Sequence, residues 1–365
     1  MPYREFSLPE YPVTEDMWDA LVKEKRPIVV YGMGNGADKL FDRLAKYGLT
    51  PADVFASDGF VRGHSFRGMR VKSFSEIKQT YPDFVILLSF ASNRSDVLDL
   101  IKSVNDSYDM YIPDMPVAGE KYFDREFYNE HYDEISKAYN AFDDEESKNA
   151  FSAIINYKIY GRMEYLLGCY SSLDEMYALI SRKKITHMTD VGAYNGDTVK
   201  QGIRYFDSLE SVLAIEPDPK NFKKLEKFGQ SVDLDLILMN CAIWSESAEG
   251  AFASGGNRNS SIDSTTSYEH KYTQVRLLRL DDVMPATDYI KYDVEGAEKE
   301  GLLGSMQTIR KFSPALLVSL YHRSEDIFSL VNYLREELPT YRFYLRRLMC
   351  VPAWEINLIL LPNDL

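Results

Sequence analysis

Residues 189–198 read TDVGAYNGDT, and this stretch decides the fold of the C-terminal half. It follows a short β-like run at Ile185–Met188 and opens a helix-like run at Val199–Phe206. The next strand-like run, Val212–Ile215, ends directly before Glu216. A strand, a glycine-bearing turn, a helix and a strand that ends in an acid form the nucleotide-binding half of a doubly wound sheet.

The glycine-bearing turn and the acid together predict a cofactor. Gly192 and Gly196 are expected because a ligand must approach the backbone closely, and a Cβ there would block it. Glu216 can accept hydrogen bonds from both ribose hydroxyls of an adenosine. The spacing is D-x-G-x-x-x-G rather than G-x-G-x-x-G, which suits a cofactor without a pyrophosphate. The turn therefore favours S-adenosylmethionine over NAD.

Length and composition restrict the class of protein. A chain of 365 residues favours two domains, and 45% hydrophobic with 13% aromatic residues predict packed interiors. The formal charge is −14, from 42 basic and 56 acidic residues. This charge disfavours nucleic acid and anionic membranes as primary partners, so a small-molecule partner is expected.

The cysteines and the apolar runs predict a cytoplasmic protein. Cys169, Cys241 and Cys350 are far apart and show neither metal-ligand spacing nor a disulfide framework. The opening MPYREFSLPE lacks the charged-then-apolar pattern of a signal peptide. The longest apolar runs are too short to cross a bilayer, so no membrane insertion is expected.

The N-terminal part carries a second glycine motif. The strand-like run Pro27–Tyr31 leads into GMGNGA at 32–37, and a helical pattern follows. Another strand, Asp53–Ala56, ends near Asp58, the position of a ribose-binding acid. Strand and helix patterns alternate to about residue 112, which predicts a small parallel α/β unit. Two interpretations stay open: a nicotinamide or sugar-nucleotide site, and a fold retained for packing or assembly.

A helical segment separates this unit from the C-terminal half. Residues Tyr122–Tyr139 and Asp143–Tyr165 carry apolar side chains at steps of three and four, with acids between them. Their aromatic residues could stack on a sugar acceptor, although a core or interface role is commoner. The acidic run at 143–147 is expected to form a first helical turn, where acids suit the helix dipole.

The C-terminal half shows the pattern of a complete sheet. Strands are expected at Ile185–Val191, Val212–Glu216, Leu236–Ile243, Tyr289–Val294 and Ala315–Tyr321, and helices at Val199–Phe206, Pro219–Phe228, Glu298–Phe312 and Glu325–Glu337. Two closing strands, Tyr341–Arg347 and Trp354–Leu361, would form an antiparallel pair, which is typical of the methyltransferase variant of the Rossmann fold. A small, polar insertion tip at 254–267 precedes the fourth strand.

The whole pattern is therefore α/β, with two Rossmann-like doubly wound sheets. We divide the chain into an N-terminal Rossmann-like domain (1–115), a helical linker (116–180) and a methyltransferase-type domain (181–365). Ligands in such sheets bind beyond the carboxyl ends of the strands. The polar residues expected at that edge are Asp190, Glu216, Asn240, Asp293, Glu295, Tyr321 and His322.

These motifs resemble those of the FkbM-type S-adenosylmethionine-dependent methyltransferases. The resemblance rests on DVGAYNGDT, AIEPDP, NCAIW, the LDD at 280–282 and above all IKYDVEGAE at 290–298, and it covers roughly residues 145–365. It implies class I methyltransferase topology and, usually, O-methylation of a hydroxylated metabolite such as a sugar or sugar nucleotide. The N-terminal unit resembles the accessory Rossmann-like domain of some members. A nicotinamide- or sugar-nucleotide-dependent enzyme and a non-catalytic assembly module are the alternatives, and a homo-oligomer is compatible with the sequence.

The resemblance also implies a set of cofactor-binding residues. Asp190, Asn195 and the two glycines would surround the methionine and ribose, with Glu216 on the ribose. Asp293 would face the methionine amino group or the acceptor, and the Tyr194 ring would cap the cofactor. The complete set is Asp190, Gly192, Ala193, Tyr194, Asn195, Gly196, Glu216, Pro217, Asn240, Ala242 and Asp293.

A hydroxyl acceptor must lose its proton, and this requirement selects the candidate catalytic residues. His322 is the preferred base, because an unperturbed pKa near 6.5 suits the role; capping of the following helix is the alternative. Asp293 and Glu295 are the other candidate bases. With Glu298 they could hold a divalent cation, but capping of the next helix explains them equally well, and no metal ligand is predicted.

Basic residues could bind an anionic acceptor at two places. These are Arg258 and the pair Arg346-Arg347. Ion pairing on the surface is the commoner role of such arginines.

Overall fold

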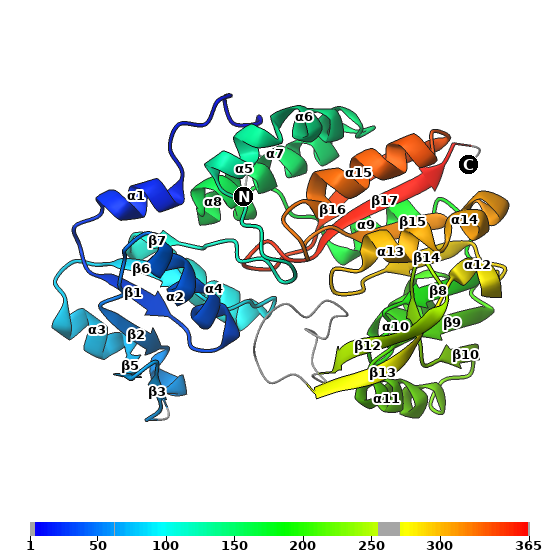
Figure 1. The fold of residues 1–365 in the computed structure, drawn as a ribbon, viewed down its shortest axis with the longest axis horizontal. Coiled ribbons are helices and arrows are strands. Elements are labelled where there is room, and N and C mark those ends of the chain that lie inside the picture. The colour runs from blue at the N-terminus through cyan, green and yellow to red at the C-terminus, as the bar shows by residue number, and fades with distance from the viewer. Residues whose placement is uncertain (1–3, 62, 255–270, 364–365) are drawn as a thin grey trace.

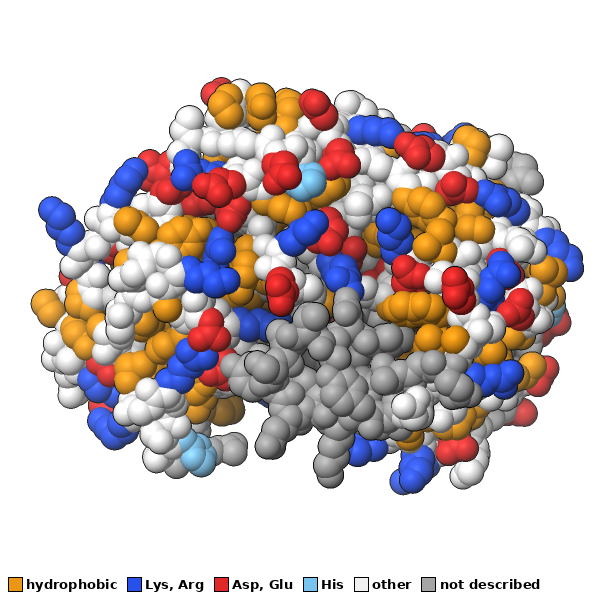
Figure 2. Space-filling view, in the orientation of Figure 1, with side chains coloured by type: hydrophobic (Ala, Val, Ile, Leu, Met, Phe, Trp, Pro, Cys, Tyr) orange, Lys and Arg blue, Asp and Glu red, His pale blue; other side chains and the backbone are white. Residues whose placement is uncertain are grey.

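The computed structural model describes residues 4–61, 63–254 and 271–363. Figure 1 shows an N-terminal α/β unit on one side, a C-terminal α/β unit on the other, and helices that join them. Each unit contains its own sheet, with helices packed on it. Over the face drawn in Figure 2, basic side chains are scattered among acidic ones rather than gathered into a stripe.

The N-terminal sheet is parallel throughout, in the order β5-β2-β1-β6-β7. Its central strands are buried along their whole length, as expected for a parallel sheet covered on both faces. The strands are β1 (Ile28–Tyr31), β2 (Asp53–Ala56), β5 (Lys72–Ser73), β6 (Val85–Leu88) and β7 (Met110–Tyr111), and the helices are α1 (Met17–Lys23), α2 (Asn35–Lys46), α3 (Phe74–Thr80) and α4 (Ser95–Ser107). A small hairpin, β3 (Ser65–Phe66) and β4 (Met69–Arg70), precedes β5.

The C-terminal sheet has the order β10-β9-β8-β14-β15-β17-β16. Its strands are β8 (His187–Val191), β9 (Ser211–Ile215), β10 (Asp235–Met239), β14 (Tyr289–Tyr292), β15 (Ala315–Ser319), β16 (Tyr341–Arg347) and β17 (Ile356–Pro362). Strand β17 pairs antiparallel with both β15 and β16. The other five strands of the sheet, β10, β9, β8, β14 and β15, are parallel to one another. The predicted closing pair is therefore confirmed.

Helices cover this sheet, and an insertion extends from it. The helices are α10 (Asp197–Tyr205), α11 (Pro219–Gly229), α12 (Leu280–Val283), α13 (Glu298–Leu303), α14 (Met306–Phe312) and α15 (Asp326–Glu337). The insertion forms a sheet of β11 (Ala242–Ile243), β13 (Lys271–Leu278) and β12 (Ala248–Ser254). Most of the polar tip predicted at 254–267, Arg258 included, lies outside the described residues.

The helical linker has more breaks than its sequence pattern predicts. It consists of α5 (Arg125–Glu130), α6 (Tyr132–Asn140), α7 (Glu145–Tyr160), α8 (Met163–Leu167) and α9 (Leu173–Ile180). Helix α7 ends at Gly161 in the left-handed conformation, with φ of 62°, which is a common way to end a helix. Its N-cap residue is Asp144, whose side chain accepts a hydrogen bond from the N–H of Ser147. The predicted acidic first turn is thereby confirmed.

Three aromatic residues of the predicted linker helices lie in the protein core. Phe123, Phe127 and Tyr128 are all buried. They belong to one hydrophobic cluster that also contains Ile86 of the first sheet and Leu316 of the second. These rings therefore hold the two units together, which favours the core role over acceptor stacking.

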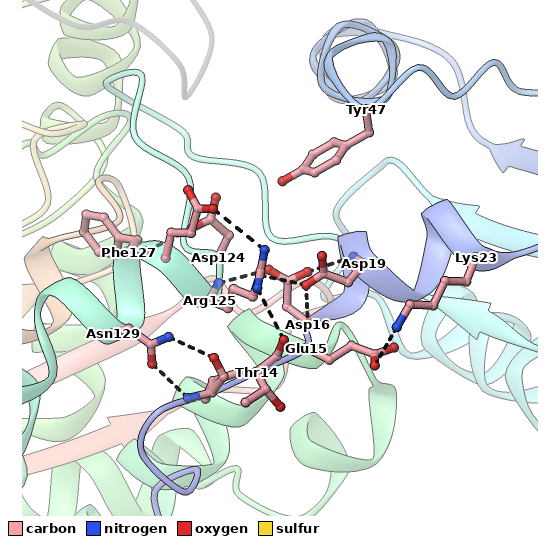
Figure 3. Close-up of polar contacts among 12 residues, drawn as sticks. Thr14, Glu15, Asp16, Asp19, Lys23, Tyr47, Asp124, Arg125, Phe127 and Asn129 are labelled. Carbon is pink, nitrogen blue, oxygen red and sulfur yellow. Dashed lines mark hydrogen bonds and ion pairs between the residues drawn. The ribbon is translucent and has the colours of Figure 1, made fainter.

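Polar contacts anchor the N-terminal segment to the linker, as Figure 3 shows. The carboxylate of Asp16 accepts hydrogen bonds from the N–H groups of Asp19 and Arg125, at 3.0 and 2.9 Å. The side chain of Asn129 exchanges two hydrogen bonds with the backbone of Val13, each of 2.8 Å. Burial raises the pKa of Asp16, although the N–H donors act in the opposite direction.

Candidate functional site

A cavity of about 480 Å³ lies at the carboxyl ends of the parallel strands of the second sheet. This is the edge where ligands bind in such sheets. All three parts of the chain contribute to the cavity, with Asn93 from the N-terminal unit and Tyr170 and Tyr177 from the linker region. Of the predicted site residues, those that line it are Gly192, Tyr194, Glu216, Pro217, Ala242, Asp293 and Glu295.

Contacts within the protein require glycine at both positions of the turn, Gly192 and Gly196. A Cβ on Gly192 would lie 2.0 Å from the carbonyl oxygen of Asp293, and one on Gly196 would lie 2.2 Å from the ring of Phe228. Their φ values are 87° and 86°, which favour glycine. Gly192 also lines the cavity, whereas Gly196 does not. The structure thus gives an internal reason for both glycines, and the close approach of a ligand stays a prediction.

Four more predicted cofactor residues do not line the cavity, and the first of them is Asp190. Ala193 is buried in a hydrophobic cluster, and Asn195 is half-buried outside the cavity lining. The exposed Asn240 donates hydrogen bonds from its amide to the carbonyls of Glu216 and Pro217, at 2.8 and 3.1 Å. Asn240 therefore braces the backbone at the end of β9.

Glu216 is positioned at the end of β9 by two backbone donors. Its Oε2 accepts from the N–H of Tyr194 and its Oε1 from the N–H of Asp218, both at 2.8 Å. The residue is 6% exposed. Burial raises its pKa to about 7, against the lowering effect of the two N–H groups. Each carboxylate oxygen keeps a second lone pair, which can accept a hydrogen bond from a ligand.

A buried lysine links the strand ends of β8 and β14. Lys291 pairs in register with Asp190, and its Nζ lies 3.7 Å from Asp190 Oδ1 and 3.3 Å from Asp293 Oδ2. Burial acts to lower the pKa of Lys291, but the two carboxylates outweigh it and raise this pKa. The pKa of Asp190 is raised to about 7 by burial, against the effect of Lys291. For Asp293, burial is outweighed by Lys291 and His322, and its pKa falls to about 2.

Lys291 lines the cavity, but sequence reasoning missed it. The only signal was a lysine between the buried residues Ile290 and Tyr292. A charged residue inside a fully buried strand is rare unless it is paired, so its position could have drawn attention.

His322 lies behind the cavity wall rather than in it. It is 0% exposed, and its side chain does not line the cavity. Its Nδ1 is 2.8 Å from Glu298 Oε1. Burial acts to lower its pKa, but Glu298 and Glu295 outweigh this and raise it to about 10. A protonated imidazole has no lone pair that could take up the proton of the hydroxyl substrate. Its protonation and its position behind the cavity wall therefore disfavour His322 as the base.

The paired arginines of β16 are structural. Arg346 forms ion pairs with Asp144 at 2.7 Å and with Glu146 at 3.0 Å. Arg347 is 0% exposed and donates to the carbonyls of Leu166 and Cys350. Neither residue lines the cavity, so neither reaches an acceptor there.

The N-terminal glycine motif adjoins a smaller cavity of about 180 Å³. This is below the range of about 300–1,000 Å³ that small-molecule pockets usually occupy. The amino group of Lys39 donates to the carbonyls of Pro116 and Val117, at 2.7 and 3.2 Å. Asp58 accepts from the N–H and hydroxyl of Ser75. These contacts favour a packing role for the motif.

Comparison with known proteins finds one matching family and several similar structures. Residues 190–345 match the methyltransferase FkbM domain. The crystal structure of methyltransferase FkbM from Methylobacillus flagellatus KT is similar over 97% of this chain and 94% of its own, with 19% identity and a TM-score of 0.66. The ribosomal protein L11 methylase of Lactobacillus delbrueckii subsp. bulgaricus shows 14% identity over 52% of this chain and 78% of its own, with a TM-score of 0.29.

No curated protein was found to match the sequence. The family match confirms the resemblance drawn from the motifs. The Methylobacillus structure shows that the fold is shared along nearly the whole chain. No helix among the described residues is both long and apolar enough to span a membrane.

Proposed function

Because residues 190–345 match the methyltransferase FkbM domain, we propose that the chain transfers a methyl group from S-adenosylmethionine to a hydroxyl group of a small molecule. One observation carries this proposal: the buried carboxylate of Glu216 faces the cavity at the end of β9. Two backbone N–H groups fix it there. This is the position at which a doubly wound sheet binds a ribose.

The cavity suits the whole cofactor. Its volume of about 480 Å³ falls within the usual range for ligands of this size. Glu216 would hold the ribose hydroxyls, and Ala242 with Ile243 would pack on the adenine. Asp293 and Lys291 offer opposite charges to the amino and carboxylate groups of the methionine part. When bound, the cofactor supplies a methyl group on a sulfonium, which a nucleophile can displace.

The protein's main contribution is to align the two reactants. Such alignment can supply about 7–11 kcal/mol of the barrier reduction. The acceptor would enter beside Asp293 and Glu295, where Tyr321 donates a hydrogen bond to Asp293 at 3.1 Å. Asn93 and Asn357 also line the cavity, and their amides suit sugar hydroxyls.

The charges favour a neutral acceptor. Lys291 is the only basic residue among the described residues that line the cavity, which also include Asp197, Glu216, Asp293, Glu295 and Glu355. A pyrophosphate would meet net repulsion there. We therefore propose a sugar or a similar polyhydroxylated molecule, rather than a sugar nucleotide, as the substrate class.

Calorimetric titration of the full chain with S-adenosylhomocysteine tests the cofactor assignment. We expect binding to one site, weakened at least tenfold in Glu216→Ala. Glu355→Gln, a second carboxylate of the same cavity, serves as the matched control and should bind normally. Release of S-adenosylhomocysteine from the methyl donor, assayed with neutral sugars and sugar nucleotides, tests the acceptor. Absence of binding in the wild type, or unchanged affinity in Glu216→Ala, would contradict the assignment.

A further inference from the structure

A buried histidine lies behind two carboxylates that line the cavity. The Nε2 of His322 lies 3.5 Å from Asp293 Oδ1 and 3.5 Å from Glu295 Oε2. Among the described residues, this buried nitrogen has no hydrogen-bond partner. We infer that His322, Asp293 and Glu295 bind a divalent metal ion, and that Glu298 orients the imidazole from behind.

The separations fit ligands that share an ion. A distance of 3.5 Å is longer than a normal N–H···O hydrogen bond, which spans about 2.7–3.2 Å. Two ligand atoms, each about 2.1 Å from one ion, lie about 3.0–3.5 Å apart when they subtend an angle between a right angle and a tetrahedral one. The two separations from Nε2 therefore suit a shared ion. The described residues whose ligand atoms all lie within 4.8 Å of one another are Asp293, Glu298 and His322, so the Glu295 carboxylate would have to move closer to Asp293 to complete the site.

Glu298 supplies the support that a metal-bound histidine normally has. Its Oε1 lies 2.8 Å from the Nδ1 of His322 and also accepts from the N–H of Val294 at 2.9 Å. A metal-binding histidine almost always donates its other ring N–H to a carboxylate, carbonyl or water. A bound metal ion would replace the proton on Nε2, so that only Nδ1 keeps its proton and the lone pair of Nε2 is directed towards Asp293 and Glu295.

The backbone holds Glu295 in an unusual conformation. Its φ is 54°, in the left-handed region, and it is followed by Gly296 with φ of 93°. A residue other than glycine seldom adopts this conformation, and such positions gather at ligand sites. In this conformation the Oε2 of Glu295 lies 3.5 Å from the Nε2 of His322. The two oxygens of Asp293 have different neighbours: Lys291 approaches Oδ2 and His322 approaches Oδ1. Asp293 could therefore bind an ion through Oδ1 and keep its ion pair with Lys291.

An ion there would have a direct role in the proposed reaction. Asp293 and Glu295 line the cavity whereas His322 does not, so the vacant coordination positions would face the acceptor. A metal ion lowers the pKa of a bound hydroxyl. The O–H proton would pass to water, the oxygen would form the new bond to the methyl carbon, and the S–C electron pair would return to sulfur. This role rests on the proposed methyl transfer, but metal binding does not.

The set of one imidazole and two carboxylates suits Mn²⁺, Fe²⁺ or Zn²⁺. We would use Mn²⁺ as the probe, with the full chain freed of metal by a chelator. Calorimetry and electron paramagnetic resonance should show saturable binding of one Mn²⁺ per chain. A crystal soaked in MnCl₂ should give an anomalous peak between His322, Asp293 and Glu295.

Variants separate this site from other carboxylates. His322→Gln and Glu295→Gln should each weaken Mn²⁺ binding at least tenfold, and Glu298→Gln by about 10–100-fold. Glu355→Gln also removes a cavity carboxylate but should leave the Mn²⁺ affinity within twofold. If His322→Gln fails to fold, Glu295→Gln carries the test, because its side chain is 22% exposed.

The outcomes distinguish this inference from the proposed function. S-adenosylhomocysteine binding without Mn²⁺ binding, or an anomalous peak elsewhere, would overturn the metal site and leave the proposed function intact. Mn²⁺ bound at the cluster by a chain that binds no S-adenosylhomocysteine would support the metal site and contradict the proposed function.

Discussion

The carboxylate of Glu216 gives a prediction that depends on pH. Burial raises its pKa to about 7, and the charges of Asp218 and Asp190 act in the same direction. Because the pKa in the folded state exceeds the ordinary glutamate value of 4.5, ionisation of Glu216 lowers the folding stability as pH rises from about 4.5 to about 7. Ligand binding should behave in the opposite way, since the ionised form accepts the ribose hydrogen bonds.

We therefore expect the affinity for S-adenosylhomocysteine to fall by about tenfold per pH unit below about pH 7. Titration calorimetry between about pH 8 and pH 6 measures this effect. The dependence should disappear in Glu216→Gln, which should bind weakly at each pH. Asp190 also has a pKa raised to about 7 by burial, so Asp190→Asn is the necessary control. A pH dependence that persists in Glu216→Gln and is absent in Asp190→Asn would assign the titration to Asp190.

Gly196 gives a second prediction at the scale of one residue. An added Cβ would be strained at φ of 86° and would meet Phe228 at 2.2 Å. Left-handed backbone costs a residue other than glycine about 1–2 kcal/mol, and overpacking adds about 1–3 kcal/mol. Gly196→Ala should lower the free energy of unfolding by about the sum of the two, measured by urea denaturation.

The matched control for this substitution is Gly48→Ala. Gly48 has φ of 70° with nothing within 4 Å of an added Cβ, so only the backbone strain applies. Adding Phe228→Ala to Gly196→Ala should remove the clash and cost less than the two single changes together. If Gly196→Ala and Gly48→Ala lower the free energy of unfolding equally, the contact with Phe228 does not contribute to the effect.

Single residues also show how far the sequence could predict this site. The position of Glu216 followed from one acid after one strand, because chain order alone sets that geometry. The environment of His322 did not follow, because Glu295, Glu298 and Asp293 reach it from a neighbouring strand end. A pKa depends on such contacts across the sheet, and the spacing within one segment does not contain them.

At the scale of elements, a buried ion pair joins helix α7 to the N-terminal unit. Lys158 Nζ lies 2.6 Å from Asp114 Oδ2, and the two side chains are 3% and 8% exposed. Removal of one partner leaves a buried charge uncompensated, which costs about 3–5 kcal/mol. Lys158→Met should therefore lower the free energy of unfolding by about this amount in chemical denaturation.

A double-mutant cycle checks the cause of this loss. Lys158→Met combined with Asp114→Asn should recover most of the stability, because no uncompensated charge remains. The exposed pair Lys137–Glu336, with side chains 55% and 65% exposed, provides the comparison between α6 and α15. Breaking it should cost less than about 1 kcal/mol. Additive effects of the two buried changes would contradict the assigned coupling.

Strand positions could be predicted well, and helix breaks could not. Strands β2 and β16 have the expected bounds. The helix expected at 298–312 is instead divided into α13 and α14 near Gly304. A Cβ there would lie 1.9 Å from the carbonyl oxygen of Trp244. This break depends on a contact with a distant loop, and periodicity along the helix cannot reveal it.

At the scale of the whole molecule, the two sheets share one hydrophobic core. A continuous cluster runs from Val29 and Ile86 in the first sheet, through Ile154 of α7, to Leu316 and Leu358 in the second. Residue Asn93 of the N-terminal unit also lines the cavity of the second sheet. We propose that the boundaries near residues 115 and 180 separate the two sheets without separating independent folding units.

A shared core predicts that the ligand stabilises the entire chain. We expect calorimetry to show a single unfolding transition, because unfolding of either sheet would expose the apolar face of α7. S-adenosylhomocysteine at about 100 times its Kd should raise the free energy of unfolding by about 2.7 kcal/mol. The whole transition should then move to a higher temperature. In a variant that lacks Trp244 and Trp354, the fluorescence of Trp18 reports on α1, which is far along the chain from the residues of the cavity. The ligand should shift the unfolding midpoint seen by this fluorescence by the same amount. A second transition that reports on Trp18 and ignores the ligand would mean that the N-terminal unit folds on its own.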